Sequence, residues 1–180
     1  SQVVIFGETG LSFAETGNSN GMSQWGLLQA YFNASQVNEF YISETTYQEM
    51  KSAGELVLIK NPALRESLGL YYSLGSNVSL SERPRFREHV RGVIPLKIQS
   101  YMWSSCFENS DFGVQRLITC DPIFAESEIA TVLKKISNND VLMEELRYWM
   151  STLKIASIIG NNSAARAKRL NSLIHSELAE

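Results

Sequence analysis

The feature that most constrains the fold is a heptad-like pattern in the last part of the chain. From residue 142 to residue 174, an apolar or small side chain recurs at alternating steps of four and three residues. This spacing places these side chains on one face of an α-helix. The pattern keeps its phase across Gly160–Ser163, so we expect one continuous helix over residues 140–177. Gly160 and Asn161 are helix stop signals, however, and leave two shorter helices as the alternative. The stripe comprises Leu142, Leu146, Trp149, Leu153, Ala156, Gly160, Ser163, Ala167, Leu170 and Ile174.

Shorter helical patterns precede this segment. Gly54 occupies the place of a left-handed C-terminal cap, and Asn61 with Pro62 supplies an N-cap and a first helical turn. Strand signals are sparse and short, at residues 39–42 and 56–59. We therefore predict an all-α protein, a bundle of four to six helices with a long C-terminal helix. Besides 140–177, the predicted helices are 22–33, 45–53, 62–80, 85–102 (restarted or kinked near Pro95) and 121–136.

The first residues of the chain differ from the rest in composition. Gly7, Gly10, Gly17 and Gly21 stand among serine, threonine and asparagine, a composition typical of loops. We expect residues 1–21 to form a flexible or loop-like N-terminal arm, with at most a short strand over residues 3–6. Residues 22–180 are then expected to form a single helical domain, since the length of the chain is close to that of one domain.

Charge and hydropathy exclude some partners. The 16 basic and 19 acidic residues leave a net charge of 16 − 19 = −3, so we expect no general nucleic-acid binding. No apolar run approaches the ~20 residues of a membrane-spanning helix. We therefore expect the chain as it stands to be soluble, with membrane attachment only through a segment outside this sequence.

The sequence shows no pattern for a cofactor or a metal ion. Gly10 is followed by Leu11 and Ser12, where a phosphate loop needs a lysine and a hydroxyl residue. His89 and His175 have no second ligand at helical spacing, and the two cysteines lack companion ligands. We therefore expect no cofactor and no metal site.

Cys106 and Cys120 are the only cysteines and flank a polar, turn-rich segment. A disulfide between them would stabilise the fold by about 3 kcal/mol in the chain-entropy model if the compartment is oxidising. Two ordinary buried thiols are the alternative, and the sequence does not separate the two.

Four arginines, Arg83, Arg85, Arg87 and Arg91, form the strongest local concentration of charge. One interpretation is a site for an anion or a phosphate-bearing partner. The other, which the counterions Glu82 and Glu88 favour, is a solvated helical face.

Two glutamates permit a catalytic hypothesis. Glu8 and Glu15 precede Gly26–Gln29, an arrangement similar to the lytic transglycosylases of the muramidase type, in which a catalytic glutamate precedes a Gly-Leu-Met-Gln segment. Glycoside cleavage needs a carboxyl group of raised pKa in a formed cleft. Neither glutamate has an apolar setting in the sequence, so solvated acids are the favoured interpretation and an enzyme the less favoured one.

Residues 39–75 resemble an uncharacterised family of bacterial membrane-anchored proteins. The resemblance implies one N-terminal membrane helix followed by a helical extracytoplasmic domain of unknown activity. It also implies an oxidising periplasmic setting, which favours the Cys106–Cys120 bridge. The matching positions are Tyr47, Lys51, Ser52, Gly54, Ile59, Asn61, Leu64, Arg65, Tyr71 and Tyr72.

These observations lead to one preferred function. We expect an extracytoplasmic helical binding or interaction domain, the sensory or scaffolding part of a membrane-anchored protein in signal transduction. A protein partner or a second copy would bind through helix 140–177. The location would be the periplasmic face of a bacterial inner membrane, or the cytoplasm if no upstream membrane helix exists. A peptidoglycan hydrolase that uses Glu8 or Glu15 is the alternative.

Overall fold

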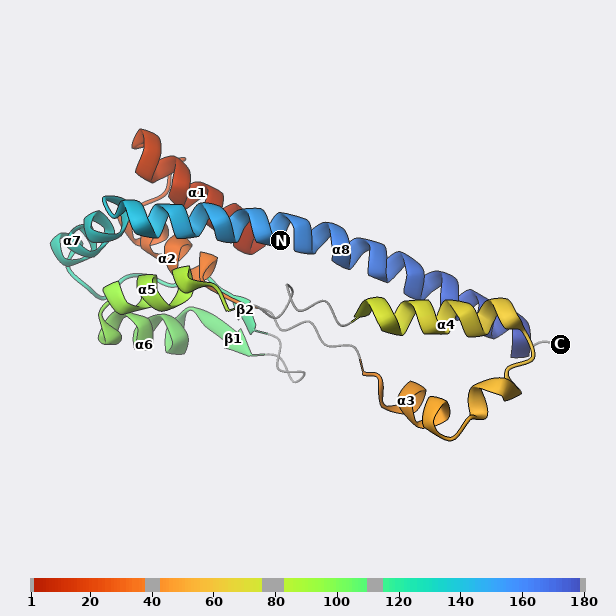
Figure 1. Cartoon of the computed structure of the whole chain (residues 1–180). Coiled ribbons are helices and arrows are strands. Elements are labelled where there is room, and N and C mark those ends of the chain that lie inside the picture. The colour runs from red at the N-terminus through yellow and green to blue at the C-terminus, as the bar shows by residue number, and fades with distance from the viewer. Residues whose placement is uncertain (1, 38–42, 76–82, 110–114, 179–180) are drawn as a thin grey trace. The chain divides into compact units, whose positions relative to one another are not determined.

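The structure is a computed structural model that describes residues 2–37, 43–75, 83–109 and 115–178. Its elements confirm an all-α protein with a long C-terminal helix (Figure 1). One segment differs from its prediction, because the N-terminal residues form a helix. Residues 85–102 divide at Pro95, as predicted. The helices are α1 Gln2–Thr16, α2 Gln24–Ala34, α3 Thr45–Ser52, α4 Pro62–Gly75, α5 Arg85–Val93, α6 Leu96–Ser105, α7 Glu126–Ser137 and α8 Asp140–Leu178, with a 3₁₀ turn η1 Glu55–Leu58 and strands β1 Phe107–Asn109 and β2 Gln115–Leu117.

The chain divides into two compact units. The first unit comprises Ser1–Val37 and Arg83–Leu153, and the second comprises Asn38–Glu82 and Lys154–Glu180. This division differs from the single domain expected over residues 22–180. The reason is that the described residues in the middle of the sequence, 43–75, fold with the last part of the chain instead of with the segments before and after them.

The first unit has a closed apolar core. Helix α2 supplies its centre, where Leu28 and Phe32 are fully buried. Helices α5, α6, α7 and the start of α8 each add an apolar face to it. Each fully buried aliphatic or aromatic side chain stabilises the fold by about 1.5–3 kcal/mol. The core includes the inward positions Phe86, Val90, Ile94, Ile98, Met102, Ile129, Leu133, Ile136, Leu142, Leu146 and Trp149.

The N-terminal segment is a helix and packs on this core, so the prediction of a loop-like arm with a short strand was wrong. Gly7 and Gly10 are buried in α1 because each lies directly against a large side chain. A Cβ atom at Gly10 would stand 2.7 Å from the ring of Tyr31, whose hydroxyl donates to the Gly10 carbonyl oxygen at 2.7 Å. Only Gly17 and Gly21, with φ of 73° and 77°, serve the turn that the glycines suggested.

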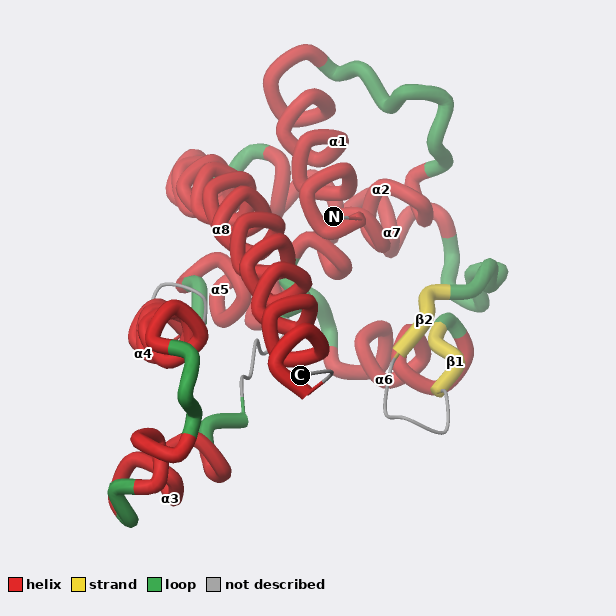
Figure 2. The backbone as a smooth tube through the Cα atoms, turned by 90° about the vertical axis from the view of Figure 1, so that its right-hand side faces the viewer, coloured by secondary structure: helices red, strands yellow, loops and turns green. Residues whose placement is uncertain are grey.

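A disulfide joins Cys106 to Cys120, with their Cα atoms 5.1 Å apart. It closes a two-stranded antiparallel hairpin, β1 and β2, which the sequence analysis did not predict (Figure 2). The chain after Cys120 is held by side chains from two helices. The Trp25 indole donates to the Cys120 carbonyl oxygen at 3.0 Å, and the Tyr101 hydroxyl donates to that of Asp121 at 2.5 Å. These bonds hold the backbone outside a helix, so α7 begins at Glu126 and not near residue 121.

The second unit contains α3, η1, α4 and the last part of α8. Gly54 has a φ of 75° and reverses the chain after α3, as predicted. The Asn61 side-chain oxygen accepts from the backbone N–H groups of Ala63 and Leu64, which confirms it as the cap of α4. The strand signal at residues 39–42 and the predicted helical residues 76–80 lie outside the described residues. Residues 56–59, the other strand signal, belong mostly to the 3₁₀ turn.

Helix α8 is continuous from Asp140 to Leu178, which confirms the heptad-like prediction over the alternative of two helices. The predicted stripe is its inward face: Leu142, Leu146, Trp149 and Leu170 are buried, and the six other stripe positions are half-buried. The stripe therefore does not form a long exposed surface of the kind expected for self-association. Among the described residues, no helix has the length and the apolar character that crossing a membrane requires.

Candidate functional site

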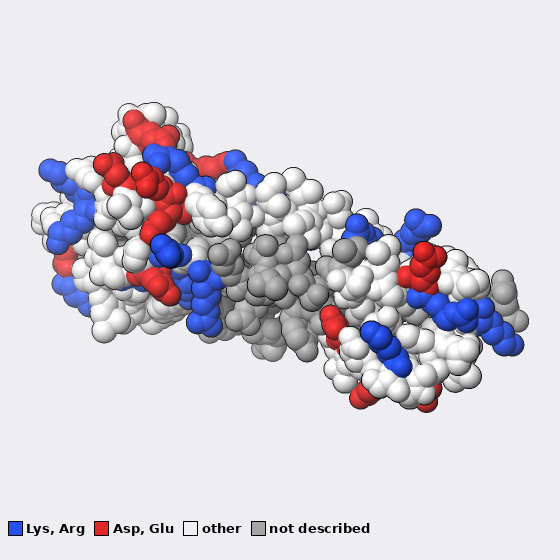
Figure 3. All heavy atoms as spheres, in the orientation of Figure 1, with Lys and Arg blue, Asp and Glu red and all other residues white. Residues whose placement is uncertain are grey.

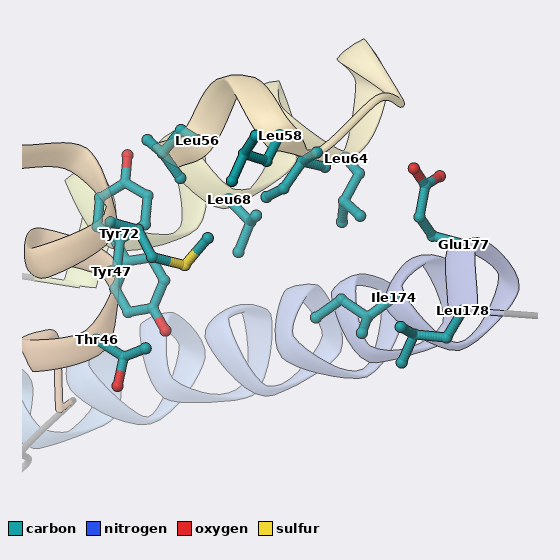
Figure 4. Close-up of a pocket in the computed structure, with 12 residues that line it drawn as sticks. Thr46, Tyr47, Leu56, Leu58, Leu64, Leu68, Tyr72, Ile174, Glu177 and Leu178 are labelled. Carbon is teal, nitrogen blue, oxygen red and sulfur yellow. The ribbon is translucent and has the colours of Figure 1, made fainter. Parts of the chain in front are cut away.

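The second unit contains an apolar pocket of about 440 Å³ (Figure 4). It lies between α3, η1 and α4 on one side and the last turns of α8 on the other. Its walls are aliphatic and aromatic, and Thr46 and Glu177 are the polar exceptions among the lining residues. Seven of the lining residues are aliphatic: Leu56, Leu58, Ile59, Leu64, Leu68, Ile174 and Leu178.

Local sequence signals build the wall that faces α8. Gly54 turns the chain back after α3, and η1 then presents its leucines on the way to the Asn61 cap. The Arg65 guanidinium reaches back from α4 and donates to the Ile59 carbonyl oxygen at 2.6 Å, which holds the link between η1 and α4. Leu64 and Leu68 then lie one turn apart on the same face of α4.

The second unit leaves much of its apolar surface uncovered. In its described part only Leu64 and Leu170 are buried apolar side chains. Leu58 and Leu178 line the pocket but remain 73% and 79% exposed. Since apolar surface in contact with water is unfavourable at roughly 25 cal/mol per Å², an apolar occupant would gain from covering these side chains.

An aromatic group closes one end of the pocket. The rings of Tyr47 and Tyr72 are stacked, with centroids 4.3 Å apart and an interplanar angle of 14°. Tyr71 meets Tyr72 edge-on at 5.1 Å. Tyr47 comes from α3 and Tyr72 from α4, so the stack joins these two helices and forms an apolar end wall.

The opposite end of the pocket is polar. The backbone N–H of Asn61 donates to Glu177 Oε1 at 3.2 Å, which connects the start of α4 to the last turns of α8. A second cavity of about 690 Å³ lies beside the first and is lined by Leu58, Lys60, Asn61 and Glu177. Leu58 and Glu177 line both cavities. The polar cavity therefore borders the apolar pocket at these two residues, and one cationic and one anionic side chain line it.

Two of the four arginines of the predicted anion site, Arg87 and Arg91, bind Ser35 at the end of α2. Arg87 Nη1 donates to the Ser35 carbonyl oxygen at 2.7 Å, and Arg91 Nε donates to Ser35 Oγ at 3.0 Å. The Arg91 guanidinium also lies over the Phe32 ring, 4.8 Å from its centroid. These two arginines hold the end of α2, whereas Arg83 and Arg85 are exposed.

Burial has lowered the pKa values of the two arginines that bind Ser35. Burial lowers the pKa of Arg87, and the neighbouring Arg83 adds to the effect. Burial, with a contribution from Arg87, lowers the pKa of Arg91 to about 10. On the face that Figure 3 draws, basic and acidic side chains are interspersed and do not gather into one basic patch.

The two glutamates of the hydrolase hypothesis lie exposed on α1. Glu15 pairs with Arg147, whose Nε stands 3.0 Å from its Oε1. Neither lines the apolar pocket or the polar cavity beside it.

Neither histidine lines the pocket. His89 pairs through Nδ1 with Glu145 at 2.9 Å, and His175 is exposed on α8. Across the described residues, no group of three or more histidine, cysteine, aspartate or glutamate side chains is arranged to hold a metal ion.

Sequence reasoning missed the pocket. Tyr71 and Tyr72 were noted as part of the resemblance, and the leucines of α4 belong to a predicted helical stripe. Helix-spaced aromatic and aliphatic residues usually indicate a filled core. No local sequence pattern distinguishes residues of a filled core from residues that line a pocket. The only available signal is the resemblance itself, since Tyr47, Ile59, Leu64 and Tyr72 all line the pocket.

Comparison with known proteins does not add to this description. No family model matches the chain, and neither the curated proteins nor the solved structures include a match.

Proposed function

We propose that this chain is a ligand-binding domain whose second unit takes an apolar group into the pocket between α3, η1, α4 and the end of α8. The observation that supports this function is a pocket of about 440 Å³ with almost entirely apolar walls that the chain itself leaves unfilled. Small-molecule sites typically enclose about 300–1,000 Å³ and are lined mainly by apolar and aromatic side chains.

Binding in this pocket would also add apolar burial to the second unit and so stabilise its folded state. With so few buried side chains of its own, this unit has little apolar burial to offset the entropy of ordering. A ligand that binds only the folded unit stabilises it by mass action, by about 2.7 kcal/mol at one hundred times its Kd. The ordering of α3 and α4 against α8 would then report ligand occupancy, which suits a sensory role.

The setting in which we propose this function is extracytoplasmic. The disulfide between Cys106 and Cys120 is of a kind that persists in oxidising compartments. The resemblance of residues 39–75 to membrane-anchored proteins with a periplasmic helical domain supports the same location. Trapping of free thiols in the protein isolated from its own cells tests this location: a reduced pair would contradict it.

A neutral apolar dye such as Nile red tests the binding function. We expect saturable binding with one site per chain. Replacement Leu68→Trp fills the pocket and should lower the affinity at least tenfold, about 1.4 kcal/mol. Leu70→Trp is the matched control, because Leu70 lies on the same helix but is 55% exposed and does not line the pocket. Absence of saturable binding, or an equal loss in both variants, would reject the proposed function.

A further inference from the structure

We infer that the natural occupant is a single-chain amphiphile with a zwitterionic head group. Its hydrocarbon tail lies in the apolar pocket, and its head lies between Lys60 and Glu177. This inference rests on the proposed function and adds the chemical class of the ligand. It follows from the adjacency of the apolar pocket and the polar cavity, which share the lining residues Leu58 and Glu177.

The walls determine the orientation of the tail. The tyrosine stack and Glu177 lie at opposite ends of the pocket, with the leucines of η1 and α4 between them (Figure 4). A chain that enters from the Glu177 end meets only apolar side chains on its way to Tyr47 and Tyr72. The opposite orientation would place a polar head against the stacked rings, and Glu177, the one charged residue in the pocket's described lining, lies at the other end.

The size of the pocket indicates one hydrocarbon chain. A volume of about 440 Å³ lies toward the lower end of the range for small-molecule sites. Two parallel hydrocarbon chains need a wider groove than this pocket, which a pair of stacked aromatic rings closes at one end. A single flexible chain fits between the α4 leucines and Ile174.

The charges at the polar end select the head group. Lys60 and Glu177 line the same cavity, and the hydrogen bond from Asn61 N–H holds the Glu177 carboxylate there. An anionic head would be attracted to Lys60 and repelled by Glu177, and a cationic head would experience the reverse. A head group that carries both signs satisfies both side chains, and each favourable pair at such a partly exposed site accounts for about a 2- to 5-fold gain in affinity.

Four amphiphiles with the same dodecyl chain test the inference by titration calorimetry on the full chain, each below its micelle concentration. They are dodecylphosphocholine, dodecyl maltoside, dodecanoate and dodecyltrimethylammonium. We expect dodecylphosphocholine to bind about 2- to 5-fold more tightly than each of the others. Lys60→Gln and Glu177→Gln should each remove this preference, and the glutamine at 177 still accepts from the Asn61 N–H. Lys51→Gln is the matched control, because Lys51 is exposed on α3 and lines neither cavity.

Substitutions that fill the apolar pocket test the placement of the tail. Leu68→Trp should abolish dodecylphosphocholine binding and Leu70→Trp should preserve it. If circular dichroism shows that Leu68→Trp fails to fold, Ile174→Trp with its control Ile158→Trp tests the same pocket from α8, since Ile158 is exposed and outside the lining.

The outcomes separate the two proposals. Equal affinity for all four amphiphiles, or a preference that survives both Lys60→Gln and Glu177→Gln, overturns the head-group inference and leaves the binding function standing. Nile red binding without binding of any amphiphile also overturns the inference alone. Binding of dodecylphosphocholine that no filling variant reduces overturns the placement of the tail. If neither Nile red nor any amphiphile binds, the proposed function fails together with the inference.

Discussion

The backbone N–H of Asn61 and the carboxylate of Glu177 form a hydrogen bond of 3.2 Å across 116 residues of sequence. Asn61 also caps α4 through its side chain, so one residue both starts this helix and joins it to the end of α8. Since this is the one hydrogen bond described between those two elements, it is the natural point at which to test the second unit.

We predict that Glu177→Ala loosens the start of α4, whereas Glu177→Gln does not. The alanine variant leaves a partly buried backbone N–H without its acceptor, which costs about 1–3 kcal/mol. Hydrogen exchange at the Asn61 amide should accelerate accordingly, while exchange in α2 stays unchanged. Equal protection of this amide in the wild-type protein and the alanine variant would show that the bond does not hold the two helices together.

Gly10→Ala should destabilise the first unit by about 1–3 kcal/mol in urea unfolding. The added methyl group would stand 2.7 Å from the Tyr31 ring and force α1 away from α2. Gly92→Ala is the matched control, because nothing lies within 4 Å of its Cβ position on α5. That control should be neutral or stabilising, by up to about 1 kcal/mol. A neutral Gly10→Ala variant would contradict the close packing of α1.

The disulfide should contribute about 3 kcal/mol to the stability of the first unit. Replacement of both Cys106 and Cys120 by serine, or reduction with a thiol reagent, should lower the urea midpoint by a corresponding amount. Trp25 fluorescence should also change, because its indole donates to the Cys120 carbonyl oxygen. Nile red binding by the second unit serves as the control and should persist at low urea, and an unchanged midpoint would contradict the structural role of the bridge.

Alkaline pH should destabilise the protein through Tyr31. Burial raises the pKa of its phenol well above the ordinary value of 10. The folded state therefore retains a proton that the unfolded state releases. The resulting stabilisation is complete below pH 10 and is lost as the pH rises further, at up to about 1.4 kcal/mol per pH unit.

Tyr31→Phe isolates this contribution. The variant loses the hydrogen bond to the Gly10 carbonyl oxygen, at a cost of about 1 kcal/mol near neutral pH. Its stability should then fall less steeply than that of the wild-type protein between pH 10 and pH 11.5, as urea unfolding at each pH would measure. Arg91, whose pKa is lowered to about 10, acts in the opposite direction in both proteins and cancels in the difference. Parallel profiles would contradict the role of Tyr31.

Sequence patterns predicted the parts of the fold that depend on neighbouring residues. The heptad-like stripe predicted that α8 is continuous and which of its faces points inward. Gly54 predicted the turn after α3, and Asn61 predicted the N-terminal cap of α4. Pro95 marked the break between α5 and α6. Each of these depends on backbone geometry within about one or two helical turns, which the identity of a few consecutive residues determines.

Local patterns failed where a distant partner decides the outcome. Gly7 and Gly10 suggested a loop, but they are the small residues that let α1 approach Met150 and Tyr31. The strands of the hairpin are three residues long, too short for a periodic signal, and lie next to the disulfide. The bonds of Arg87 and Arg91 to Ser35 were also missed, because Ser35 lies far away from both of them in the sequence.

By itself, therefore, the sequence determined the helical class, the long terminal helix, its inward face, the turn after α3 and the N-cap of α4, because these follow from spacing and backbone preference. Only the tertiary structure decided that α1 packs on the core, that residues 43–75 fold with the end of α8, and that a pocket remains between them. A pocket is space that side chains leave unfilled. It depends on how segments more than 100 residues apart, such as Asn61 and Glu177, approach one another, and no local pattern specifies that distance.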